Sequence, residues 1–155
     1  MAAKPIPEGY SSITPYLTVD DAKAAIEFYK RAFGATEGGV MDSPDGKVAH
    51  AELQIGDSKI MLSDPFPQSA CKTPKELGGT TVAIFLFVED VDSVVQDAAD
   101  AGATITMEPE DQFWGDRLGQ VTDPFGNVWQ IATHIEDLTP EEIETRGREA
   151  FSSAG

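Results

Sequence analysis

The chain has 155 residues, of which 27 are acidic and 11 are basic, so its formal net charge at pH 7 is −16. This balance argues against nucleic acid and anionic membranes as partners, because both bind basic surfaces that displace counterions. The single cysteine excludes a disulfide within one chain, and because neither a membrane-length apolar run nor a secretory signal is evident, we expect a cytoplasmic protein.

In chain order, the first half predicts a strand, a helix and then more strands. Residues 12–19 alternate loosely between apolar and polar side chains and feed a helix, whose apolar residues recur at three- and four-residue spacing until Gly34. A hairpin tip, two strands and a proline-rich loop follow at residues 43–46, 48–55, 59–63 and 64–79.

The second half repeats this order of elements. A strand, a helix and three further strands are expected at residues 82–88, 91–101, 104–107, 118–122 and 128–134. Residues 17–21 also resemble residues 86–90 in their letters, at an offset of 69. The repeat predicts an α+β fold of two βαβββ modules. Because one helix covers only one face of a sheet, we expect the ligand or partner at the other face.

The end of the chain predicts a C-terminal helix. Thr139 has the position of an N-cap, Pro140 falls at the first helical position, and Glu142 completes a capping box. Since the apolar stripe is thin, two interpretations stay open. The helix docks on a sheet edge or a partner, or it is a solvated tail.

Five short motifs indicate a family. They are residues 15–21 (Pro-Tyr-Leu-Thr-Val-Asp-Asp), 50–58 (His-Ala-Glu-Leu-Gln-Ile-Gly-Asp-Ser), 114–117 (Trp-Gly-Asp-Arg), 123–127 (Asp-Pro-Phe-Gly-Asn) and 132–137 (Ala-Thr-His-Ile-Glu-Asp). Together with the repeat, they resemble the vicinal oxygen chelate superfamily of glyoxalases, bleomycin-resistance proteins and dioxygenases, in particular its PhnB-like branch.

The resemblance implies a glyoxalase/bleomycin-resistance-type fold with a concave cavity, assembled as a homodimer. It implies one domain over residues 1–155, with modules at about 11–66 and 80–137, a linker at about 67–79 and the C-terminal helix at about 139–151. In the metal-dependent members, four strand positions bind a divalent ion. Here these positions fall on Thr14, Met61, Ala83 and Gln130. Because none of these side chains is a carboxylate or an imidazole, we expect no metal and no other cofactor.

Strand alternation selects the residues expected to face the cavity. His50 and Glu52 share one face of their strand, and His134 shares the parity of Gln130. If they converge, these two histidines and Glu52 are candidates for acid–base catalysis; otherwise they are solvated rim residues. The candidate ligand-binding residues are Tyr16, Met61, Phe85, Phe87, Phe113, Trp114, Arg117 and Gln130.

Arg117 has two interpretations. It borders the cavity from a loop after Trp114, or it is a structural partner of one of the many carboxylates. The other carboxylates, such as Asp64 and Asp111, are expected to act as solubility charges.

Three functions compete. The leading prediction is a metal-independent protein that binds a small hydrophobic or amphipathic organic molecule. The alternative is a lyase, isomerase or dioxygenase-type enzyme with a relocated metal site or metal-free acid–base chemistry. The third is an interaction module whose cavity is filled by side chains.

Overall fold

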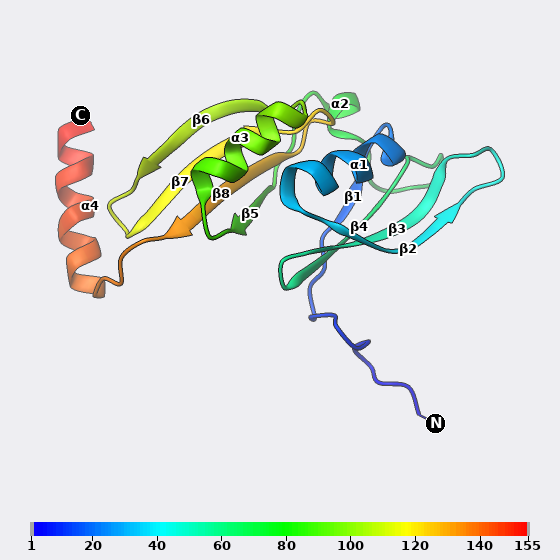
Figure 1. Cartoon of the computed structure of the whole chain (residues 1–155), viewed down its shortest axis with the longest axis horizontal. Coiled ribbons are helices and arrows are strands. Elements are labelled where there is room, and N and C mark those ends of the chain that lie inside the picture. Colours follow the sequence, from blue (N-terminus) through cyan, green and yellow to red (C-terminus); the bar gives the residue numbers. More distant parts are fainter. Residues whose placement is uncertain (1, 155) are drawn as a thin grey trace. The chain divides into compact units, whose positions relative to one another are not determined.

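A computed structural model describes residues 2–154 and divides the chain into two compact units (Figure 1). The first unit runs to Thr81 and includes the short segment Pro124–Asn127. The second unit contains Val82–Asp123 and the chain from Val128 onward. Each unit contains a four-stranded sheet.

The first unit contains one long helix and a mixed sheet. Its elements are β1 (Tyr16–Thr18), α1 (Ala22–Phe33), β2 (Thr36–Asp42), β3 (Val48–Ile55), β4 (Ser58–Ser63) and α2 (Pro74–Leu77). The strand order is β1-β4-β3-β2, with β1 parallel to β4 and the other pairs antiparallel. The expected bounds of α1 are confirmed: the Asp21 carboxylate accepts from the N–H of Ala24 at 3.1 Å, and Gly34 ends the helix with a φ of 67°.

The core of the first unit lies between α1 and one face of its sheet. α1 buries a stripe that includes Phe28 and Tyr29, and β3 and β4 bury Leu53 and Leu62. Phe125, from the short segment of this unit, packs against both Phe28 and Tyr29 with ring centroids 6.3 and 6.5 Å apart. Burial of such side chains is the main stabilising term of the unit.

Asp64 is a buried connector and not a solubility charge. Its carboxylate accepts from the N–H of Ala22 at 3.1 Å and from the N–H of Val48 at 2.8 Å. It therefore ties the end of β4 to the starts of α1 and β3. Buried charge is tolerated here because both carboxylate oxygens are hydrogen-bonded.

The second unit repeats the strand–helix–three-strand order. Its elements are β5 (Ala83–Phe87), α3 (Val91–Ala101), β6 (Thr104–Asp111), β7 (Asp116–Thr122), β8 (Val128–His134) and α4 (Pro140–Ala154). The sheet order is β5-β8-β7-β6, with β5 parallel to β8. α3 lies over one face of this sheet (Figure 1). The core there includes Trp129 and Ile131 of β8, Val121 of β7 and Val95 of α3.

Several elements differ from the sequence-based expectation at their edges. β1 is shorter than predicted, a short helix α2 lies inside the expected linker, and β6 continues four residues beyond the predicted end to Asp111. β7 begins at Asp116, so that Arg117 lies on a strand and not in a loop. β6 is an edge strand interrupted by bulges, and its outer half contains Glu108, Pro109 and Glu110. Such polar, proline-containing strands are tolerated at edges and resemble loops in sequence.

α4 is longer than predicted and mostly exposed. Within its described residues, Gly147 is the buried position. Phe113 packs there, because a Cβ on Gly147 would lie 3.1 Å from the Phe113 ring, and the Phe113 and Phe151 rings are 5.7 Å apart. None of the helices in residues 2–154 combines the length and the apolar character needed to cross a bilayer.

Tyr10 packs onto the first unit with an unpaired hydroxyl. Lys59 Nζ lies 4.6 Å from the centre of the Tyr10 ring, a cation–π contact. The Tyr10 hydroxyl oxygen is buried and has no hydrogen-bond partner among the described residues. A buried hydroxyl without a partner lowers stability, because its hydrogen bond to water is lost and not replaced.

We therefore predict that Tyr10→Phe stabilises the protein. The free energy of unfolding should rise by about 1 kcal/mol, which corresponds to a Tm about 2–4 °C higher. Tyr10→Leu, the control that removes the ring and its contact with Lys59, should lower the Tm. Thermal melts followed by circular dichroism measure both, and a lower Tm for Tyr10→Phe would contradict this account.

Candidate functional site

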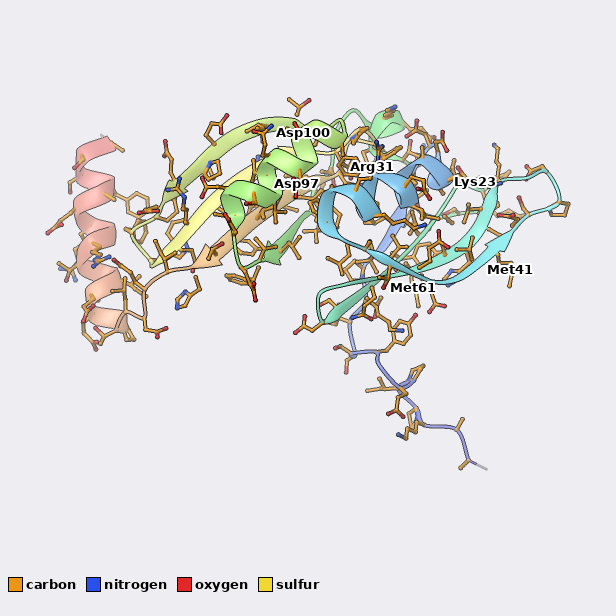
Figure 2. All side chains as sticks on the ribbon, in the orientation of Figure 1. Lys23, Arg31, Met41, Met61, Asp97 and Asp100 are labelled. Atoms are coloured by element: carbon orange, nitrogen blue, oxygen red, sulfur yellow. The ribbon has the colours of Figure 1, made fainter. Side chains whose placement is uncertain are left out.

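The face of the first sheet that α1 leaves uncovered is the main candidate site. We call it the first open face, formed by Tyr16, His50, Glu52, Gln54, Lys59 and Met61. These side chains share one side of the sheet because Met61 of β4 pairs with Tyr16 of β1 and with Glu52 of β3, and alternate residues of a strand share a face. Figure 2 labels Met61 on the side of the sheet away from Arg31 of α1.

Burial along β3 agrees with this alternation. Ala51, Leu53 and Ile55 are buried toward α1, whereas Glu52 and Gln54 are half-buried on the first open face. The sequence therefore placed Glu52 on the correct side of its strand.

Tyr16 and His50 form a pair on the first open face. The Tyr16 hydroxyl oxygen lies 3.0 Å from Nδ1 of His50, and the ring centroids are 5.5 Å apart. Tyr16 is 47% exposed. This geometry orients the imidazole through one nitrogen, which is an arrangement used for proton transfer and also for holding two rings as a binding wall.

Glu52 lies beside a glycine pair of the edge strand β2. A Cβ on Gly38 would be 3.3 Å from Cβ of Glu52, and a Cβ on Gly39 would be 3.5 Å from Oε2 of Glu52. No hydrogen bond or ion pair joins the Glu52 carboxylate to another residue of the described range 2–154. This role of the glycines was not predicted from the sequence, although a Gly-Gly pair in a strand indicates close approach or a bulge.

The second sheet also has an open face, opposite α3. Phe85 and Phe87 lie there with ring centroids 5.0 Å apart, and they are 43% and 61% exposed. Gln130 pairs in register with Phe85, and its Nε2 donates to Oε1 of Gln120 at 3.3 Å. Phe85 and Phe87 thus form an exposed aromatic pair on this unit, beside the hydrogen-bonded amides of Gln130 and Gln120.

Trp114 and His134 belong to one hydrogen-bonded cluster at the end of β8. Trp114 Nε1 donates to Oδ2 of Asp116 at 2.9 Å, and Oδ1 of the same buried carboxylate lies 2.8 Å from Nδ1 of His134. The other ring nitrogen of His134 lies 2.8 Å from Oδ1 of Asp137. The two carboxylates raise the pKa of His134 above its ordinary value, with the hydrogen bond to Asp116 as the larger cause.

Arg117 lies on the α3 side of its sheet. It pairs in register with Thr133, whose parity is opposite to that of Gln130. Its guanidinium forms a two-pronged pair with Asp92 of α3, at 2.8 and 3.0 Å, and its Nη1 donates to Asp111 at 3.0 Å. The structure thus brings Arg117 together with carboxylates and not with Phe85 or Gln130. Arg117 lowers the pKa of Asp92, chiefly through this hydrogen bond.

The catalytic candidates divide between the two units. His50 and Glu52 lie on the first unit, two residues apart on β3. His134 lies on the second unit, with both ring nitrogens in contact with carboxylates. Asp116, the buried partner of His134, was not predicted; the sequence signal for it is the register of two neighbouring strands, which a single sequence does not show.

The four positions that the resemblance assigns to metal ligands hold side chains of other chemistry. Met61 lies on the first open face, and Gln130 donates a hydrogen bond to Gln120. Ala83 is the first residue of β5, and Thr14 precedes β1. This donor set does not fit a divalent cation, which requires carboxylates or imidazoles. Among residues 2–154, no group of three or more histidine, cysteine, aspartate or glutamate side chains is arranged to hold a metal ion.

Comparisons with known proteins agree with the fold. Residues 11–131 match the family model described as the Glyoxalase/Bleomycin resistance protein/Dioxygenase superfamily. The Mycobacterium bovis protein Mb0911c is 46% identical over 147 residues, which cover 93% of this chain and 94% of the relative. The solved structure of Arabidopsis thaliana At5g48480 is 33% identical, with a TM-score of 0.64 over 79% of this chain and 98% of its own. The PhnB protein of Bacillus cereus, at 20% identity, shares the fold with a TM-score of 0.63 over 79% and 99% of the two chains.

The His134 cluster predicts a pH-dependent contribution to stability. Because the folded-state pKa of His134 is raised, its stabilising effect is complete below the ordinary histidine pKa of about 6.5 and is lost as the pH rises through the raised value. The Tm difference between the wild type and His134→Gln should therefore be larger at pH 5.5 than at pH 8.5. A difference that stays constant or grows with pH would contradict this assignment.

A nuclear magnetic resonance titration tests the cause of that shift. Asp137→Asn should lower the pKa of His134, because one of its two carboxylate partners is neutralised. Asp100→Asn, which removes a charge on α3, is the matched control and should leave the His134 titration in place.

Arg117→Ala is predicted to lower the Tm by a few degrees. The substitution leaves Asp92 and Asp111 without their shared cation and removes the link between α3 and β6. Arg148→Ala, which breaks an exposed pair within α4, is the control and should change the Tm little. An unchanged Tm for Arg117→Ala together with weaker ligand binding would instead support the cavity role of Arg117.

Proposed function

The chain belongs to the Glyoxalase/Bleomycin resistance protein/Dioxygenase superfamily, and we propose that it binds a small hydrophobic or amphipathic organic molecule without a metal ion. The proposed binding surface is the first open face. The observation that supports it most directly is the hydrogen-bonded Tyr16–His50 pair beside half-buried Met61, on a sheet face that α1 leaves uncovered.

The chemistry of this face suits an amphipathic ligand. Small-molecule sites combine aromatic and apolar walls with a few placed polar groups that fix orientation. Tyr16 and Met61 supply the apolar and aromatic surface, and His50 and Glu52 supply the polar groups. Phe85 and Phe87 on the second unit offer a further aromatic surface of the same kind.

We also propose that the protein is a cytoplasmic homodimer with a single domain. Each unit has a sheet face opposite its long helix that a second copy could cover, and two-fold dimers are the commonest closed assemblies of soluble proteins. Light scattering that gives the mass of one chain would count against the dimer.

A second candidate function is metal-free acid–base catalysis. The specific observation in its favour is the 3.0 Å contact between the Tyr16 hydroxyl and Nδ1 of His50, which orients the imidazole as a general base requires. The two functions differ in outcome, because a binding protein returns its ligand unchanged whereas a lyase or isomerase converts it.

The test uses the methyl groups of the methionines, of which the chain has four. With 13C-methyl methionine labelling, a fragment set of aromatic and amphipathic compounds should shift the Met61 signal, which Met61→Leu assigns, and leave that of Met107 in place. Chromatography of the recovered fragments detects conversion. Metal analysis of the same preparation tests the expectation that no stoichiometric metal is bound.

Tyr16→Ala should lower the affinity for the fragments that shift the Met61 signal. The expected decrease is about fivefold, which corresponds to about 1 kcal/mol for a lost aromatic contact. Phe151→Ala, which removes an exposed aromatic ring from α4, is the matched control and should leave their affinity unchanged. Fragments that bind without shifting Met61 would contradict the proposed surface.

A further inference from the structure

We propose that Glu52 binds a protonated amine, so that the ligand class of the first open face is an aromatic or apolar amine. This inference rests on the proposed function, because it assigns the ligand chemistry of the same surface. The observation behind it is the carboxylate of a half-buried glutamate on an inner strand of the sheet, to which no residue of the described range 2–154 donates a hydrogen bond.

Each polar neighbour of Glu52 on this face is directed to another partner. Lys59 Nζ lies over the Tyr10 ring, at 4.6 Å from its centre. Gln54 Nε2 donates to the carbonyl oxygen of Gly56 at 3.0 Å. His50 uses Nδ1 for the Tyr16 hydroxyl. The Glu52 carboxylate is thus surrounded by hydrogen-bond donors on this face, and none of these three side chains donates to it.

A ligand can supply the partner that the described residues of the chain do not supply to the Glu52 carboxylate. The Glu52 residue is half-buried, and a charged group that loses contact with water is stabilised by a counter-charge or by hydrogen-bond donors. A ligand ammonium provides both, because its N–H groups form charge-assisted hydrogen bonds to a carboxylate. The net charge of −16 also raises the local concentration of cations around the protein.

The glycine pair of β2 keeps the carboxylate accessible from the edge of the sheet. Neither Gly38 nor Gly39 has a positive φ, so the backbone itself does not require glycine at these positions. What the missing side chains provide is space: Oε2 of Glu52 lies 3.5 Å from where a Cβ of Gly39 would stand. A larger residue at position 39 would cover the carboxylate without altering its charge.

The row of paired residues sets the shape of the ligand. Glu52, Met61 and Tyr16 lie in register on β3, β4 and β1. Since neighbouring strands are about 4.8 Å apart, the amine site and the aromatic site are separated by about 10 Å at the backbone, and less between side chains. An aromatic ring joined to an ammonium by a short alkyl chain spans this row, with its ring on Tyr16 and its chain on Met61.

The experiment compares three probes of similar size and different charge. They are 2-phenylethylammonium, 2-phenylethanol and 3-phenylpropanoate, titrated at pH 7 while the 13C-methyl signal of Met61 is followed. The ammonium should bind at least tenfold more tightly than the alcohol, which corresponds to a difference of about 1.4 kcal/mol in binding free energy. The carboxylate should bind most weakly. The preference should decrease in 0.5 M salt, because exposed charges are then screened.

Two variants assign the preference to Glu52. Glu52→Gln keeps the shape of the side chain and should remove the preference for the ammonium over the alcohol. Glu110→Gln removes the same charge from β6 of the second unit and should keep the preference. Gly39→Val should weaken binding of the ammonium more than binding of the alcohol. The Tm of each variant shows whether the fold is retained.

The outcomes separate this inference from the proposed function. Equal binding of ammonium and alcohol at Met61, or a preference that survives Glu52→Gln, overturns the amine assignment and leaves the proposed function standing. The same holds if the fragment set shifts Met61 and none of the three probes does. If neither the fragments nor the probes shift Met61, both the amine assignment and the proposed surface are wrong.

Discussion

One helix for each four-stranded sheet is the constraint on which this molecule depends. A sheet has two faces, and α1 and α3 each cover one, so the opposite face of each sheet is left without that helix. On the covered faces the choice of residues follows from packing, as Leu53, Leu62, Val121 and Trp129 show. On the opposite faces, polar and exposed aromatic residues such as Glu52, Phe85 and Phe87 are not explained by packing against a helix.

The elements that could be predicted from the sequence are those with local signals at both ends. α1 and α3 were predicted correctly because each has an aspartate N-cap, a clear apolar period and a glycine after its last turn. The edge strands β2 and β6 were missed or shortened because their residues are polar or glycine and gain their strand conformation from a neighbour. The superfamily inferred from the motifs is confirmed by the family model.

The candidate site was predicted only in part, because alternation along a single strand gives the face of some residues and not of others. Alternation along β3 alone places Glu52 on the other face of the strand from Ala51 and Leu53, so this assignment needs no knowledge of the neighbouring strands. Placing Arg117 and Asp116 requires the register between β7 and β8, where one residue decides the face. Asp116 opposes His134 and shares its face, whereas Arg117 points to α3. Tertiary pairing of this kind has no signature in a single sequence.

The excess of acidic residues means that the absence of a basic partner does not by itself distinguish a carboxylate in this chain. Its location in the fold has to be considered as well. With 27 acidic and 11 basic residues, one-to-one pairing would leave most carboxylates without a basic partner, so an unpaired one is ordinary at the surface, where water solvates it. Asp64 shows the other limit, since its buried carboxylate is satisfied by two backbone N–H groups. Glu52 follows neither pattern: the residue is half-buried, its polar neighbours contact other partners, and glycines leave its carboxylate open on one side. A group held in this state by a well-packed strand is available to a partner from outside the chain, and a cation is the partner that its chemistry selects.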